Sequence, residues 1–138
     1  MSSITEKTLM QQKLQKLIRC VDRIKSQNIS TLQDLDASLD KQEIIILNLQ
    51  RAVQICIDIG NHILIDYSAI PATMADTFKA MGEKGLITKA CADNLIKMVS
   101  FRNIAVNRFE KINNTIILSV IKEHLTDFTD FAESVSKL

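Results

Sequence analysis

Residues 100–109, Ser-Phe-Arg-Asn-Ile-Ala-Val-Asn-Arg-Phe, contain the side chains best suited to chemistry on a charged substrate. Arg102 and Asn103 form a polar pair at the end of an apolar helical pattern, and Ile-Ala-Val follows them. A buried guanidinium needs acceptors, so Arg102 in this position predicts an exposed groove or a dimer interface. The alternative is a helix-terminal arginine that binds the last carbonyl groups of its own helix.

The two histidines are weaker candidates for chemistry. Asp58, His62 and Asp66 are four residues apart and share one face of a predicted helix. Two carboxylates and one imidazole from a single helix make a poor metal shell, so we interpret His62 as a hydrogen-bonded structural residue and predict no metal site. His124 lies in an apolar stripe and is interpreted as a core or interface residue. The sequence has no glycine-rich phosphate loop, and no cofactor is predicted.

The three cysteines, Cys20, Cys56 and Cys91, are widely spaced and include no CxxC pair. This pattern is typical of neither a disulfide scaffold nor a zinc site. Each cysteine lies in a helical apolar pattern. All three are therefore predicted to be small buried hydrophobic residues rather than nucleophiles.

The elements that position these residues are predicted to be helices. Apolar residues recur at spacings of three and four over residues 5–26, and again from about Ser38 to Ile65. The apolar face of the second segment is wide enough to be covered by several neighbours, which predicts a central helix. Gly60 inside this segment predicts close approach of another helix.

Shorter helical segments follow the only proline. Their predicted starts are Thr73 as N-cap of residues 74–81, Thr88 as N-cap of the helix that carries Arg102, and Asn114 for a last helix that contains His124. The polar stretch 107–114 is expected to contain the turn before that last helix.

Length and composition predict the fold class. The chain of 138 residues has the size of one domain, so we predict a single helical domain over residues 1–138. Apolar residues make up 46% and charged residues 24%, which excludes wholesale disorder. Three glycines and one proline are too few for the turns of an all-β fold. We therefore predict an all-α, four- to five-helix up-and-down bundle without a sheet.

The charge balance limits the kinds of ligand. Lysine and arginine number 17 against 16 aspartates and glutamates, a net charge of +1, so no strong overall field attracts nucleic acid. Basic residues are spread fairly evenly along the chain, and any RNA contact would have to be local. No apolar run approaches the length of a signal peptide or membrane span, which predicts a cytoplasmic protein without membrane contact.

Several segments together resemble the HepT-like branch of the HEPN superfamily, the toxin of HepT–MntA toxin–antitoxin modules. The similarity covers roughly residues 40–115. It includes ILNLQRAVQICIDIGNHIL in the central helix, TFKAMGEKGLI after the proline, and FRNIAV at residues 101–106. The last segment matches the start of the family motif, which is Arg, a polar residue often Asn, a few apolar residues, His, any residue and Tyr.

The resemblance implies an RNA-cleaving homodimer regulated by a nucleotidyltransferase. In the family, two motifs meet across a two-fold axis and cleave RNA without metal. The histidine helps to activate the ribose 2′-hydroxyl, while the arginine holds the phosphate. The tyrosine accepts AMP from the MntA antitoxin. Carried over to this chain, Arg102 and Asn103 match the motif, Asn107 takes the histidine position and Phe109 takes the tyrosine position.

Both departures from the motif have chemical consequences. Asn107 cannot transfer a proton near neutral pH, whereas an imidazole can, and general acid–base catalysis contributes about 100- to 10,000-fold. Asn107 can still orient a hydroxyl or phosphate group by hydrogen bonds. Phe109 has no hydroxyl to accept a nucleotide. The sequence is thus compatible with a HepT-like ribonuclease scaffold, with an inactive homologue that only binds a nucleotidyltransferase, or with a structural helical adaptor.

Overall fold

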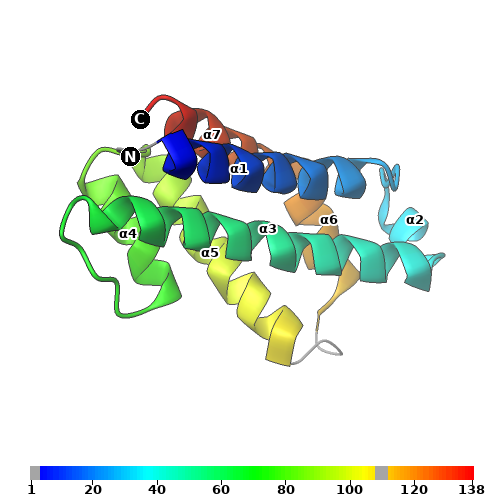
Figure 1. Ribbon diagram of the computed structural model, residues 1–138. Coiled ribbons are helices and arrows are strands. Elements are labelled where there is room, and N and C mark those ends of the chain that lie inside the picture. Colours follow the sequence, from blue (N-terminus) through cyan, green and yellow to red (C-terminus); the bar gives the residue numbers. More distant parts are fainter. Residues whose placement is uncertain (1–3, 108–111) are drawn as a thin grey trace.

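The computed structural model describes residues 4–107 and 112–138 (Figure 1). Within these ranges the chain forms seven helices and no strand. The helices are α1 (Ile4–Lys25), α2 (Leu32–Asp36), α3 (Leu39–Ile65), α4 (Met74–Glu83), α5 (Lys89–Asn107), α6 (Asn114–Glu123) and α7 (Leu125–Ser136). The prediction of an all-α fold is confirmed.

Helix α3 is the central element of the bundle. It packs along α1 and also contacts α2, α4, α5 and α7, as Figure 1 shows for its long neighbour α1. Its buried side chains include Ile45, Leu49, Val53 and Cys56, which follow the three- and four-residue spacing of an amphipathic helix. The predicted central helix is therefore present. Among the described helices, none combines the length and apolarity needed to cross a bilayer.

Gly60 is a point of close approach between α3 and α4. A Cβ atom built on Gly60 would lie 2.6 Å from Cγ2 of Thr77 and 2.9 Å from Sδ of Met81. Both neighbours are buried residues of α4. The close approach predicted from this glycine is confirmed, and it sets the position of α4 on the central helix.

Local hydrogen bonds define where the helices begin. The Ser38 hydroxyl accepts from the backbone N–H of Lys41 at the start of α3. The Thr73 hydroxyl accepts from Asp76 N–H at the start of α4. Thr88 makes the corresponding bond at the start of α5. Because each cap uses atoms only three residues apart, these starts could be predicted from short segments.

The number of helices exceeds the predicted four to five, for two reasons. Residues 32–36 form a short helix of their own, capped by Thr31. The segment after Asn114, predicted to be one helix, is divided at His124, whose backbone leaves the helical region with φ −120° and ψ −4°. Nδ1 of His124 lies 2.8 Å from Oδ2 of Asp127, which stabilises this break.

Candidate functional site

Arg102 lies in the last two turns of α5, with its side chain directed at α3. The neighbouring Phe101 and Ala105 are buried, so they anchor this end of α5 in the core. Nη2 of Arg102 donates to Oε1 of Gln54 at 2.9 Å, and Nη1 donates to Oδ1 of Asn103 at 3.2 Å. Both hydrogen bonds go to side chains, so the alternative of an arginine bound to its own helix carbonyls is not the arrangement found.

Among the described residues, the acceptors of Arg102 are neutral amide oxygens, and none of them is a carboxylate. A guanidinium has five N–H donors, and these two bonds orient it while leaving others for a ligand. Gln54 is itself held, because its Nε2 donates to Oδ1 of Asp58 at 2.9 Å. The result is a half-buried arginine with a fixed orientation, suited to binding a phosphate or carboxylate group.

The other motif positions lie toward the end of α5. Asn103 and Asn107 are four residues apart, so they share one face of the helix, and both are exposed. Asn107 is the last residue of α5. The motif position Phe109 and part of the predicted turn lie outside the described residues. Arg102 and Asn103 are thus in contact through a hydrogen bond. Asn107 lies one turn beyond Asn103, at the exposed end of α5.

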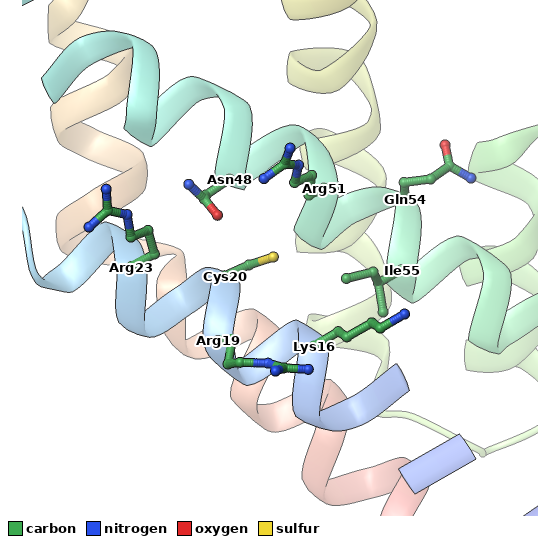
Figure 2. A pocket seen from close by; sticks show the side chains of 8 residues that line it. All are labelled: Lys16, Arg19, Cys20, Arg23, Asn48, Arg51, Gln54 and Ile55. Atoms are coloured by element: carbon green, nitrogen blue, oxygen red, sulfur yellow. The ribbon is translucent and has the colours of Figure 1, made fainter. Parts of the chain in front are cut away.

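A second charged feature lies between α1 and α3. It is a groove of about 550 Å³, which we call the basic groove (Figure 2). Its lining residues are Lys16, Arg19, Cys20, Arg23, Asn48, Arg51, Gln54 and Ile55. Four of these side chains are cationic and none is anionic, and Gln54 is also the residue that orients Arg102.

The pKa of the Cys20 thiol is influenced by the positive charges of the basic groove. Burial raises the pKa of Cys20, while the positive charges of Arg51 and Arg19 act in the opposite direction. Figure 2 shows the Cys20 sulfur directed into the space between α1 and α3. Cations from both helices therefore act on the same point of the groove.

The basic groove corrects the view that basic residues are evenly distributed. Lys16, Arg19 and Arg23 are spaced by three and four residues, which places them on one face of α1. That spacing was a usable signal, and sequence reasoning missed it. Arg51 joins the three from α3, 28 or more residues further along the chain, and only packing of α3 on α1 brings it there.

The remaining sequence candidates have structural roles. All three cysteines are buried and free, as predicted. His124 is half-buried and pairs with Asp127, whose other carboxylate oxygen accepts from Nδ2 of Asn94. The expected hydrogen bond of His62 is not found within the described part of the chain, since Asp58 binds Gln54 instead. Over residues 4–107 and 112–138, no three His, Cys, Asp or Glu side chains are grouped to hold a metal ion.

Comparison with known proteins identifies close relatives. The model of the family described as ribonuclease HepT-like matches residues 12–135. The mRNA nuclease HepT of Shewanella oneidensis is 37% identical over 124 residues, which cover 89% of this chain and 92% of that protein.

Solved structures agree with the sequence match. A chain in a crystal structure of a toxin–antitoxin complex with AMP-PNP superposes with a TM-score of 0.88 at 34% identity, covering 95% of this chain and 99% of that one. A tri-AMPylated Shewanella oneidensis HEPN toxin, in complex with MNT antitoxin, gives a TM-score of 0.87 at 35% identity, covering 94% and 97% of the two chains.

Proposed function

The chain belongs to the HepT-like ribonuclease family, and on this basis we propose that it is the toxin component of a toxin–antitoxin pair, an RNA-binding ribonuclease scaffold neutralised by an MntA-type nucleotidyltransferase. The proposal treats residues 1–138 as one HepT-like domain. Arg102 is its phosphate-binding residue, with Asn103 and Asn107 beside it.

The observation that carries this proposal is the environment of Arg102. Its guanidinium is oriented by two neutral amide oxygens, at 2.9 and 3.2 Å, and remains partly accessible. A purely structural arginine is expected to pair with a carboxylate, because an uncompensated buried charge is costly. The lack of a carboxylate partner among the described residues, at an accessible helix end, favours an anionic ligand, and the phosphodiester of RNA is the ligand implied by the family.

Cleavage in this family needs a group that accepts the proton of the ribose 2′-hydroxyl as its oxygen attacks the adjacent phosphate. The bond from that phosphate to the 5′-oxygen of the next nucleotide breaks, and the leaving oxygen takes up a proton. Asn107 occupies the histidine position and cannot accept that proton near pH 7. Its amide can still bind the 2′-hydroxyl or a phosphate oxygen. We therefore propose that the chain binds RNA and cleaves it slowly, in a site completed by Arg102 from two protomers of a homodimer.

The second candidate function is docking without catalysis. It is favoured by the same two positions, because Asn107 lacks a titrating group and Phe109 lacks the phenolic oxygen that would accept AMP. In that case the chain would bind a nucleotidyltransferase through the surface around α5 and cleave no RNA. A structural adaptor would differ from both in showing no RNA affinity that depends on Arg102.

The substitution Asn107→His separates these functions. It returns a group that titrates near neutral pH to the motif, so RNA cleavage should rise by about 100-fold or more. The activity should persist in EDTA and be lost again in Asn107→His combined with Arg102→Ala. Asn107→Gln is the matched control, because it changes the side chain without adding a proton acceptor.

Cleavage of labelled RNA by the purified variants, analysed on denaturing gels, measures this directly. A folded, dimeric Asn107→His protein without activity on any RNA would favour the docking function. Arg102→Lys should also be impaired, since a lysine cannot make the planar two-point contact with a phosphate.

A further inference from the structure

We propose that the basic groove between α1 and α3 binds the phosphodiester backbone of single-stranded RNA and directs the strand toward Arg102. This inference rests on the proposed function, because it extends the surface that holds the substrate of a ribonuclease. It assigns an RNA-binding role to side chains outside the motif of α5.

Positive charge in the groove is concentrated and not neutralised. Lys16, Arg19, Arg23 and Arg51 line one cavity, and none of its lining residues carries a carboxylate. Within the described part of the chain, none of the four forms an ion pair with a carboxylate. Since the whole chain has a net charge of only +1, this grouping produces a local positive potential that the total charge conceals.

The arrangement of the cations suits an extended polyanion better than a small one. Lys16 and Arg23 are seven residues apart on one face of α1, which corresponds to about 10 Å along the helix. Arg51 faces them from α3. The floor contains buried Cys20 and Asn48, both uncharged side chains at neutral pH. A row of charges along a groove matches successive phosphates of a strand.

The basic groove is continuous with the site around Arg102. Arg51 and Gln54 are three residues apart and are therefore neighbours on the surface of α3. Figure 2 shows Gln54 at the edge of the groove with its amide turned away from α1. That amide accepts the 2.9 Å hydrogen bond from Arg102. A strand lying between α1 and α3 would therefore reach the motif arginine at the Gln54 edge.

The lining contains no aromatic ring on which a base could stack. Contacts in the groove would accordingly go to phosphates, so binding should be independent of sequence and strongly dependent on salt. The other class of ligand for such a groove is an acidic protein surface, and the experiment below distinguishes it from RNA.

The test measures binding of fluorescein-labelled oligouridylates of 3 and 12 nucleotides by fluorescence anisotropy across a salt series. The full chain is compared with the double variant Arg19→Ala, Arg51→Ala. The control, Lys7→Ala with Lys89→Ala, removes the same charge from exposed positions that do not line the groove. Thermal unfolding of each protein checks that the fold is intact.

We expect the groove variant to lose about tenfold or more in affinity for the 12-nucleotide strand, with the 3-nucleotide strand and the control variant little affected. The slope of log affinity against log salt should become shallower by about 1.4, because each phosphate contact with a single strand contributes about 0.7.

Equal affinities and slopes for the groove variant and its control would overturn the proposal that the basic groove binds RNA. If RNA binding still depended on Arg102, the proposed function would stand. Absence of RNA binding by the unmodified chain would count against both proposals. Unchanged RNA affinity of the groove variant, together with loss of its complex with an MntA-type nucleotidyltransferase in gel filtration, would reassign the groove to a protein partner.

Discussion

Arg102 on α5 is held by Gln54 on α3 through a 2.9 Å hydrogen bond between Nη2 and Oε1. The two residues are 48 positions apart, and Gln54 is fixed in turn by Asp58. This chain of bonds gives the motif arginine its orientation without neutralising it. Gln54 is therefore a positioning residue for the site, although the family motif on α5 does not include it.

Replacing Gln54 should weaken RNA binding in a way that depends on charge. Gln54→Glu keeps the acceptor but pairs Arg102 with a carboxylate, so affinity for RNA should fall more than in Gln54→Ala, which only frees the guanidinium. We expect about tenfold for the glutamate variant. Anisotropy titrations measure this, with Gln50→Glu as the control that adds the same charge one turn away. Equal losses for both glutamate variants would show that Gln54 acts only through overall charge.

The proposed homodimer should use the exposed apolar residues beside Arg102. The side chains of Ile104 and Val106 on α5 are 45% and 53% exposed, and both lie close to Arg102 in the sequence. Each protomer contributes one Arg102 to the proposed site. An interface through this surface would bring two Arg102 side chains into one cleft. Ile104→Glu should give a monomer by light scattering. Ile70→Glu, at a 95% exposed position in the connection between α3 and α4, should leave the dimer intact. A monomeric unmodified chain would contradict the composite site.

Phe109→Tyr should make the chain a substrate for the proposed MntA-type nucleotidyltransferase. The phenolic oxygen would attack the α-phosphate of ATP, forming a phosphodiester to AMP and releasing pyrophosphate. The unmodified chain should form the complex in gel filtration but gain no mass, because position 109 offers no nucleophilic oxygen. Intact-mass spectrometry measures AMP addition. AMP on the unmodified chain, at Tyr67 or at a serine or threonine, would show that the acceptor position is wrong.

Gly60→Ala should destabilise the fold despite the better helix propensity of alanine. The added methyl would lie 2.6 Å from Cγ2 of Thr77, whose rotamer is held by a 2.7 Å hydrogen bond from its hydroxyl to Asn61. Overpacking of this kind costs about 1–3 kcal/mol, against a gain of about 1 kcal/mol from propensity. Urea unfolding should show a net loss of up to about 2 kcal/mol. Combining it with Thr77→Ser, which removes the clashing methyl and keeps the hydroxyl, should restore most of this loss.

Buried thiols should make stability fall at alkaline pH. Burial, with the charges of Asp127 and Asp130, raises the pKa of Cys91 from 9.0 to about 11. The unfolded thiol ionises first, so this contribution to the free energy of unfolding is complete below pH 9 and is lost as pH rises toward 11. The loss from Cys91 alone is about 2 kcal/mol. Urea unfolding of Cys91→Ala between pH 8 and 10.5 should therefore show a shallower decline than the unmodified chain.

Much of the fold could be predicted because its determinants are local. Ser38, Thr73 and Thr88 bind backbone groups three residues away, so a short segment contains both donor and acceptor. The apolar spacing of α3 likewise indicates a central helix without any knowledge of its neighbours. The division of the last helix at His124 escaped prediction, because the pairing of His124 with Asp127 is stabilised by Asn94 from another helix.

For the candidate site, the sequence by itself determined which residue types stand at the motif positions, including Asn107 and Phe109, and thereby which proton and nucleotide transfers those side chains can perform. Only the tertiary structure decided that Gln54 orients Arg102 and that Arg51 joins the cations of α1 in one groove. The physical reason is distance along the chain. Side-chain chemistry and helix periodicity are local properties, whereas these contacts exist only once the buried faces of α1, α3 and α5 have packed together.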